Sequence, residues 1–497
     1  MFDSILFWNA VALEANRVSH TNFVDFGLDE QIGPTRSSRA LAIVHLAMYD
    51  AYAGVAATPA ALPPYTTTLP APDPGSSLDA AVAGAAYKTL SDLFPSQKPF
   101  FDLVLTGAGD ITNPGHNFGV TVAMAILADR AGDPSGASPG YIAPMVRGKH
   151  RPDPDNPGQG FHGAFYGAQS KGFAVTQRFE LAAPPFDDNE YRRALREVRS
   201  RGIAPELMGT LPNPNNGRTA NETLVGIFWA YDGVAGLGTP MRLYNQIARR
   251  VAMTRSPASS STPNTVAENA RLFAFVNVAM ADAGILSWDQ KYIHELWRPV
   301  VGIREHDRSM GPAATQAGNT ISANCDMSWL PLGAPHSNRI RKNFTPPFPA
   351  YPSGHATFGA AAFHIMRLFY GVSVGDRHRD DLLQDSMGEL LEFVSDECNG
   401  ISTDNKGAVR PRHHRSFDDG LWQMIEENGR SRVYLGVHWV FDAFVVKDDN
   451  TPNLERTDDD GKFFGGVPLG LQIAENIFSE GDGKAPCKKP TTIVPRA

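Results

Sequence analysis

The sequence predicts an all-α protein whose helices are separated by long loops. Three observations predict this class. Apolar residues recur every three or four positions along most of the chain, as on one face of a helix. Stretches with the alternating pattern of strands are few, and segments rich in Pro and Gly separate the helical ones. With 497 residues, of which 42% are hydrophobic and 20% charged, the composition is that of an ordinary globular protein.

Helices are predicted throughout the chain, and a stripe such as Leu41, Val44, Met48 and Ala51 shows the spacing on which they rest. In the first half they cover 4–17, 39–52, 78–94, 118–131 and 190–202. In the second half they cover 221–232, 241–255, 265–283, 288–300, 356–370, 379–394 and 421–441. We place the division near residue 215. This gives an N-terminal helical half (1–215) and a C-terminal helical half (216–497) within one compact unit.

The stretch 134–167 carries many Pro and Gly residues and is predicted to be a long irregular excursion that lines an entrance. Its histidines, His150 and His162, have no ligand partners nearby and are expected on the surface. The neighbours His413, His414 and Arg415 form a basic cluster without acidic or thiol partners at metal-ligand spacing. We therefore interpret this cluster as a solvated loop.

Charge and cysteine content restrict the partners. The net charge of −8 argues against nucleic acid or an anionic membrane as partner. No apolar run reaches membrane-spanning length. No signal peptide is visible at the N-terminus, and the compartment stays open, export included. The three cysteines allow at most one disulfide and have no metal-type spacing.

The central stretch of the sequence runs from Phe344 to Phe358. Four prolines hold its backbone extended, and the apolar spacing becomes helical after His355. Ser353, Gly354 and His355 should therefore lie at a helix N-terminus, where free N–H groups and the helix dipole favour an anion. The alternative is a serine that caps the helix beside an exposed histidine.

Two further clusters favour the anion site. Lys291 and Arg298 are seven residues apart, which places both on one face of a helix. Arg432 and His438 lie in a buried segment, where they are costly without partners. Asp442 follows His438 by four residues and is placed to accept the other N–H of the imidazole. The alternatives are a solvated basic face for the first cluster and a core histidine for the second.

Together the clusters supply three cations, two neutral donors and two histidines. Such a set is a cage for a tetrahedral or trigonal-bipyramidal oxyanion, for example phosphate or vanadate. One histidine can bond the central atom, and the other can move protons on the opposite side.

In this order, the three clusters resemble the signature that vanadium-dependent haloperoxidases share with the type 2 phosphatidic acid phosphatase superfamily. Segments outside the signature resemble the fungal haloperoxidases and extend the similarity over most of the chain. They include Phe7-Trp8-Asn9, Trp229 to Gly233, Tyr244 to Ile247, Phe348 to Pro352 and Gly465 to Gly470. This resemblance implies two four-helix bundles with long connecting loops.

The resemblance also implies the cofactor and the role of each residue. Vanadate would be bound covalently through His438, the only metal ligand, with Asp442 supporting that histidine. Its oxygens would be held by Lys291, Arg298, Ser353, Gly354 and Arg432. His355 would accept and return a proton, Lys291 would polarise the bound peroxide, and Asp232 would hold Arg432. The substrates would be halide, hydrogen peroxide and an organic acceptor.

Aromatic residues bear on which halide is used. Trp288, Phe348, Phe344 and Pro346 match positions near the halide in chloroperoxidases, and an apolar wall there would desolvate a halide. Chloride is therefore favoured over bromide, the alternative being that Trp288 and Phe348 are core residues. A rival reaction is phosphomonoester hydrolysis with His438 as nucleophile and His355 as general acid. A non-enzymatic anion-binding protein is disfavoured by the redundancy of the cage.

Overall fold

The structure, a computed structural model, describes residues 2–56, 58, 61–186, 188–314 and 322–496. Over these residues the regular structure is helical, with isolated β-bridges and no strand. The prediction of an all-α protein is thus confirmed. The three cysteines are free thiols.

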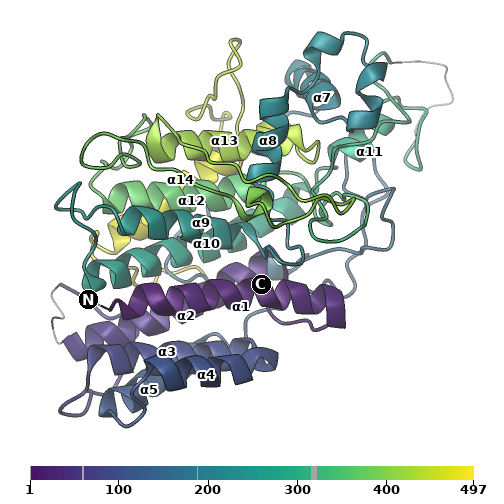
Figure 1. Ribbon diagram of the computed structural model, residues 1–497. Coiled ribbons are helices and arrows are strands. Elements are labelled where there is room, and N and C mark those ends of the chain that lie inside the picture. The colour runs from purple at the N-terminus through teal and green to yellow at the C-terminus, as the bar shows by residue number, and fades with distance from the viewer. Residues whose placement is uncertain (1, 57, 59–60, 187, 315–321, 497) are drawn as a thin grey trace.

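The N-terminal helices form one packed group at the bottom of Figure 1. They are α1 (Ser4–Phe26), α2 (Gly33–Ala56), α3 (Leu78–Leu93), α4 (Lys98–Ala108) and α5 (Pro114–Asp129). Helix α3 packs against both α2 and α5. Glycines allow the closest approach, because a Cβ at Gly119 would lie 2.0 Å from the carbonyl oxygen of Ala81. Small residues therefore set the distance between α3 and α5.

A second group packs around α12, in the middle of Figure 1. Its members are α8 (Ala220–Phe228), α9 (Pro240–Ala252), α10 (Val266–His294), α12 (Gly354–Phe369), α13 (Gly420–Tyr434) and α14 (Gly466–Glu480). Helix α12 contacts α10, α13 and α14, and α10 also packs against α2. One buried apolar core therefore runs through both groups. The division near residue 215 stays a prediction.

Short elements lie in the long connections between these helices. They are η1 (Pro95–Gln97), α6 (Tyr166–Gln169), α7 (Asn189–Arg201), η2 (Pro205–Thr210), η3 (Pro214–Asn216), α11 (Pro299–Arg304), η4 (Asp396–Cys398) and η5 (Val440–Asp442). The charged helix predicted at 190–202 is α7. Its apolar side packs inward through Tyr191, Leu195 and Val198.

Helix α10 is the central helix and is longer than the sequence predicted. Its 29 residues replace a predicted helix at 265–283 and the start of another at 288–300. By length and composition alone it could cross a membrane, although 94% of its most apolar window is buried inside the protein. The expectation that no run reaches this length was therefore wrong for α10. Burial among other helices explains its apolar composition.

Two predictions about the site helices were also wrong. Lys291 and Arg298 do not share a helix, because α10 ends at His294, Glu295 turns into the left-handed region with φ 52°, and α11 begins at Pro299. Likewise α13 ends at Tyr434, and Gly436 has φ 74°. His438 therefore lies in the turn that follows α13 and not within a helix.

The helix predicted at 379–394 is absent, and the chain forms a tight turn there. The carboxylate of Asp385 accepts the backbone N–H groups of Met387 at 2.8 Å and Glu389 at 3.0 Å. Gly388 between them has φ 81°. An aspartate that bonds nearby backbone groups competes with the helix, and here it prevails over the apolar spacing.

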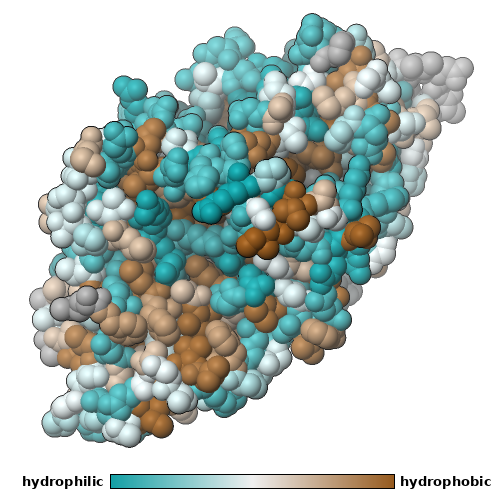
Figure 2. Space-filling model, viewed as in Figure 1, coloured by the Kyte–Doolittle hydropathy of each residue, from teal (hydrophilic) through white to brown (hydrophobic). Residues whose placement is uncertain are grey.

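Helices α4 and α14 were not predicted. Helix α4 exposes apolar side chains, with Phe100 42% and Leu103 72% exposed. Figure 2 shows hydrophobic residues gathered on the lower part of this face, over the N-terminal helices. Elsewhere on this face, hydrophilic residues surround smaller hydrophobic groups.

Candidate active site

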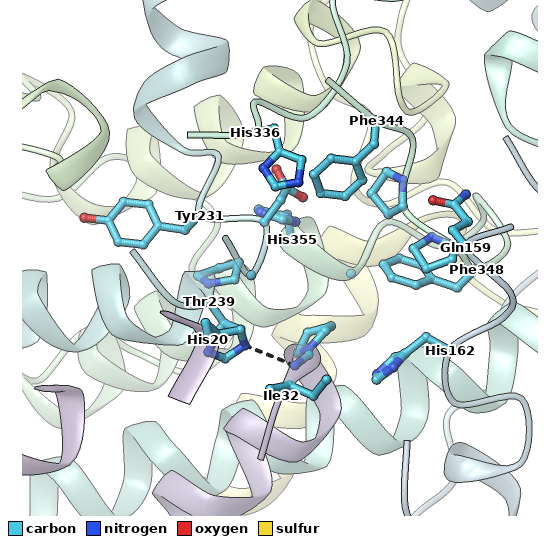
Figure 3. Close-up of a pocket in the computed structure, with 18 of the residues that line it drawn as sticks. His20, Ile32, Gln159, His162, Tyr231, Thr239, His336, Phe344, Phe348 and His355 are labelled. Carbon is cyan, nitrogen blue, oxygen red and sulfur yellow. Dashed lines mark hydrogen bonds between the residues drawn. The ribbon is translucent and has the colours of Figure 1, made fainter. Parts of the chain in front are cut away.

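A cavity of about 610 Å³ opens where the N-terminus of α12 faces the long loops. Figure 3 shows its walls coming from segments far apart in the sequence: His20 from α1, Tyr231 from the turn after α8, Phe344 and Phe348 from the loop before α12, and His355 from α12 itself. Asp232, Trp288, Gly354, Arg432 and His438 complete the inner wall.

The backbone of residues 348–352 is held by two buried cations. The ammonium group of Lys291 donates to the carbonyl oxygens of Pro349 at 2.8 Å and Ala350 at 3.2 Å, and also to that of Pro352. Arg298 donates from Nε to the carbonyl oxygen of Phe348 at 2.9 Å. Lys291 is fully buried, and Arg298 is 1% exposed. These bonds bring Lys291 and Arg298 against the proline-rich stretch that precedes α12.

His438 is fixed in one tautomer. Its Nδ1 lies 2.7 Å from the Asp442 carboxylate, so Nδ1–H donates and Nε2 keeps the lone pair. Nη1 of Arg298 lies 2.8 Å from that Nε2. The carbonyl oxygen of Asp442 also accepts the backbone N–H of Ser353 at 2.8 Å. Asp442 therefore joins the histidine to the N-terminus of α12, although no α-helix runs between positions 438 and 442.

Ser353, Gly354 and His355 form the N-terminus of α12, as the sequence indicated. Ser353 caps the helix, and its Oγ accepts the N–H of Ala356 at 3.4 Å. A Cβ at Gly354 would lie 3.2 Å from the Trp288 ring, so only glycine fits without displacement. His355 lines the cavity with Nε2 placed 2.6 Å from the carbonyl oxygen of Ala230.

One turn supplies partners to two of the site residues. Asp232 accepts two hydrogen bonds from Arg432, at 2.7 and 3.0 Å. The carbonyl oxygen of Ala230, two residues earlier, is hydrogen-bonded to Nε2 of His355. Between them Tyr231 has φ 45°, which is strained for a residue with a side chain. The turn thus sets the position of one histidine and one arginine together.

Helix η4 holds this turn. The carboxylate of Glu397 accepts the backbone N–H of Tyr231 at 3.3 Å, and the N–H of Asp396 donates to the Tyr231 hydroxyl at 2.7 Å. Glu397 is fully buried and pairs with Arg410 at 2.7 Å. Sequence reasoning missed Glu397. Its side-chain partners Arg410 and Ser337 lie 13 and 60 positions away in the chain, so no local pattern marked it.

Lys291, Arg298, Arg432 and His438 are here called the cationic floor. Arg432 and His438 line the inner end of the cavity, Lys291 and Arg298 lie behind that lining, and none of the four is more than 2% exposed. Burial lowers the pKa of Lys291 and of His438 well below their usual values, and the neighbouring Arg298 lowers both further. Burial, with Arg432 adding to it, lowers the pKa of Arg298 to about 9. The three cationic side chains outnumber the two carboxylates beside them, Asp232 and Asp442, and a bound anion would offset the burial and repulsion that lower these pKa values.

Hydrogen-bond donors without a partner also indicate that the floor would bind an anion. Nη2 of Arg298 and Nε of Arg432 are buried and have no hydrogen-bond partner among the described residues. A buried guanidinium N–H without a partner costs about 1–3 kcal/mol. An anion at the floor would accept these bonds and neutralise the excess charge. Within the described residues there is no cluster of three or more His, Cys, Asp or Glu side chains that could hold a metal cation.

The residues predicted near the halide lie together on the aromatic wall of the cavity. The rings of Trp288 and Phe348 are 4.8 Å apart. The ammonium nitrogen of Lys291 lies 5.1 Å from the Phe348 ring centre, which is within the range of a cation–π contact. Phe344 and Pro346 line the same cavity. Trp288 is only 1% exposed, yet it lines the cavity. It is therefore both a core packing residue and part of the wall.

The two histidines expected on the surface are not there. His150 is 1% exposed, and burial with the nearby Arg298 lowers its pKa well below the usual value. His162 lines the cavity, with Nε2 3.0 Å from the hydroxyl of Thr35. The reason is that the loop folds over the end of α10, where Trp288 and Tyr292 both donate to the carbonyl oxygen of His162.

The rest of that loop agrees with the prediction, because Asn156 and Gln159 also line the cavity. His413 and His414 are exposed as expected, whereas the Arg415 side chain is largely buried and pairs with Glu427, so the solvated-loop prediction was wrong for Arg415. Among the cavity residues that were not predicted are two histidines, His20 and His336. His20 accepts the N–H of Gly33 at 3.1 Å, the bond drawn as a dashed line in Figure 3. Neither lies in a motif, so only the fold reveals them.

Comparisons with known proteins agree on one family. Residues 2–160 match the family described as vanadium chloroperoxidase N-terminal domain, and residues 271–447 match the family of its second helical-bundle domain. The chain is 36% identical to the vanadium chloroperoxidase of Curvularia inaequalis, over 96% of this chain and 90% of that protein.

Solved structures share the fold. A bacterial vanadium-dependent iodoperoxidase matches with a TM-score of 0.62 and 19% identity, over 96% of both chains. A holo-type bacterial vanadium-dependent chloroperoxidase matches with a TM-score of 0.56 and 14% identity, over 92% of this chain and 93% of that one.

Proposed function

The chain belongs to the vanadium chloroperoxidase family, and from this premise we propose that it uses vanadate to oxidise halide with hydrogen peroxide. The balanced reaction is X⁻ + H₂O₂ + H⁺ → HOX + H₂O, and the hypohalous acid then halogenates an organic acceptor. The observation that carries the proposal is the cationic floor, which combines buried excess positive charge with a histidine in a single tautomer.

The residues present fit vanadate. Nε2 of His438 keeps a lone pair and would be the ligand to the metal, while Asp442 holds its other nitrogen. Arg298 and Arg432 each have an N–H group that is free to donate to the oxygens of the anion. The N-terminus of α12 at Ser353 and Gly354 adds backbone donors. Vanadate, when bound there, supplies a Lewis acid that makes hydrogen peroxide electrophilic.

His355 is the group that would move the proton. Its Nε2–H donates to the carbonyl oxygen of Ala230, which leaves the lone pair on Nδ1. Burial, with Arg432 adding to it, lowers the pKa of His355 to about 3. A bound anion would remove part of that repulsion and raise this pKa. The ring is therefore neutral before the reaction and can accept a proton at Nδ1 and return it.

Lys291 and Asp232 would act through position and charge. The ammonium group of Lys291 lies between the 349–352 backbone and the rings of Trp288 and Phe348. From there its charge would polarise bound peroxide. Asp232 would keep the guanidinium plane of Arg432 in one orientation through two hydrogen bonds.

We propose chloride as a substrate, with bromide also accepted because it is easier to oxidise. The support is the aromatic wall formed by Trp288, Phe344 and Phe348, with Pro346, which excludes water from an approaching halide. The similarity to a protein named vanadium chloroperoxidase points the same way.

Two assays test the proposal. Metal-free protein is mixed with vanadate, hydrogen peroxide and either bromide or chloride, and halogenation of monochlorodimedone is followed. Hydrolysis of p-nitrophenyl phosphate is measured without vanadate. We expect vanadate-dependent halogenation with both halides. Phosphate ester hydrolysis without any halogenation, even at high vanadate, would replace the proposal with the phosphatase reaction.

A further inference from the structure

The cavity is much larger than the small reactants require. Its volume is about 610 Å³, whereas a water molecule in the liquid takes about 30 Å³. A halide and a peroxide are each of similar size to water. Cavities of about 300–1,000 Å³ are typical of sites for organic ligands. Most of the space beyond the cationic floor therefore remains for a further, larger molecule.

The wall of this outer space is apolar and aromatic. Phe344 and Phe348 lie on one side, as Figure 3 shows. Prolines 346 and 347, which separate them in the chain, also line the cavity. Ile32 stands apart from the two phenylalanines, near His20 in the same view. Flat apolar walls of this kind bind planar rings through burial and ring contacts.

The outer edge carries two exposed cations. Arg341 and Lys342 line the cavity and are exposed, and no ion pair with either is found among the described residues. Their neighbour Arg339, by contrast, is paired with Asp25. The net charge of the chain is −8, so these two cations are a local exception to the overall charge. We call Arg341, Lys342 and the adjoining His336 the mouth.

The loop that carries the mouth is fixed in place. Its ends are joined by two backbone hydrogen bonds between Ala334 and Phe344, at 2.8 and 3.1 Å. Asn338 anchors its middle, bonding Ala235 at 2.8 Å and Thr403 at 2.9 and 3.0 Å. Arg341, Lys342 and Phe344 therefore belong to one short closed loop, and Phe348 follows it in the chain. A ligand can therefore contact the cations and the aromatic rings without the free-energy cost of ordering the loop.

We propose that the outer cavity binds the organic acceptor as an aromatic anion, such as a phenol carboxylate. Its ring lies against Phe344 and Phe348, and its carboxylate faces Arg341 and Lys342. This inference rests on the proposed function, which supplies the hypobromous acid that brominates the bound ring. In that reaction a ring C–H bond is replaced by C–Br, and the released proton and the hydroxide of hypobromous acid form water. The site thereby selects among acceptors.

The binding test uses equilibrium dialysis with 4-hydroxybenzoate and its neutral isostere 4-hydroxybenzamide. Vanadate or inorganic phosphate is present and peroxide absent, so that the floor is filled and does not bind the carboxylate. We expect the acid to bind about fivefold more tightly than the amide, from two exposed charges. The double variant R341Q/K342Q should abolish that preference. The control K406Q/R412Q removes two exposed cations outside the cavity and should keep it.

A second test measures selection during turnover. The acid and the amide compete for bromination by the vanadate-loaded enzyme with bromide and peroxide, and the product ratio is divided by that for reagent hypobromite. The expected quotient is about five for the wild type and the control, and about one for R341Q/K342Q. Equal binding of acid and amide, or a quotient of one in the wild type, overturns the inference.

The two proposals fail in different ways. Bromide oxidation without any organic acceptor, followed as tribromide, reports on the proposed function alone. If tribromide does not form, the proposed function is wrong, and dialysis with phosphate still decides whether the outer site exists. If tribromide forms and acid and amide behave alike, the enzyme oxidises halide but has no acceptor site.

Discussion

The two ends of the cavity use positive charge in opposite ways. At the cationic floor, Lys291 and Arg298 are buried and bonded to backbone carbonyl groups, and Arg432 is bonded to Asp232. At the mouth, Arg341 and Lys342 are exposed and have no ion-pair partner among the described residues. Charges interact more strongly where water is excluded. On the two proposals made above, the floor holds one small anion tightly and the mouth attracts a larger one weakly.

The largest effect is expected for His438→Ala. Because Nε2 of His438 would be the only protein atom bonded to the metal, its loss should weaken vanadate binding by about 1,000-fold, beyond the 10–100-fold typical of supporting residues. Vanadate affinity is measured by dialysis, with the exposed His413→Ala as control. Near-native affinity of His438→Ala would mean that the ligand is misassigned.

The same substitution at the two ends should differ sharply in stability. Arg432→Gln leaves the buried Asp232 without its partner and should lower the free energy of unfolding by about 3–5 kcal/mol. Arg341→Gln, at an exposed site, should change it by less than about 0.5 kcal/mol. Denaturant unfolding of both variants tests this contrast. If both variants lost a similar free energy of unfolding, the contrast between a buried floor and an exposed mouth would be contradicted.

Asp442→Asn tests the support of the histidine. The carboxylate of Asp442 accepts Nδ1–H of His438, and burial raises the pKa of this carboxyl to about 7. The amide is a weaker acceptor and should reduce vanadate affinity by about 10–100-fold while leaving the fold intact. Dialysis of vanadate, beside the exposed Asp449→Asn, provides the measurement. An unchanged affinity would remove Asp442 from the site.

The pH dependence of stability should differ between the buried and the half-buried histidines of the cavity. Burial lowers the pKa of His20 to about 4, so the neutral ring stabilises the folded state above pH 6.5, and this contribution is lost as pH falls from 6.5 toward 4. Between pH 7 and 5 the stability advantage of wild type over His20→Gln should shrink by about 2 kcal/mol. For His336, which is half-buried, the corresponding change should be smaller. Equal changes would contradict the burial argument.

Sequence reasoning identified the floor because its chemistry demands particular residue types. A cage for an oxyanion needs cations, a helix N-terminus and a histidine, and Lys291, Arg432 and His438 stand in recognisable patterns. The family resemblance placed Asp232 beside Arg432. The bond from the same turn to His355, however, could not be found, since its partner is the backbone carbonyl group of Ala230, which leaves no trace in the sequence. Buried Glu397 escaped notice for a similar reason.

Local patterns also failed where tertiary structure decided. Apolar spacing at 379–394 predicted a helix, but Asp385 bonds the nearby backbone and makes a turn. Lys291 and Arg298 were placed on one helix, although the left-handed Glu295 separates them. They still meet, because both bond the same extended segment before α12. The site thus depends on that segment more than on a shared helix face.

The most direct measurement is the anomalous X-ray signal of vanadium in crystals of the protein prepared with vanadate. We expect one peak at bonding distance from Nε2 of His438, with Arg298 and Arg432 turned toward it. A floor without vanadium, or a peak bonded elsewhere in the protein, would contradict the claim that these distant segments bind one metal oxyanion.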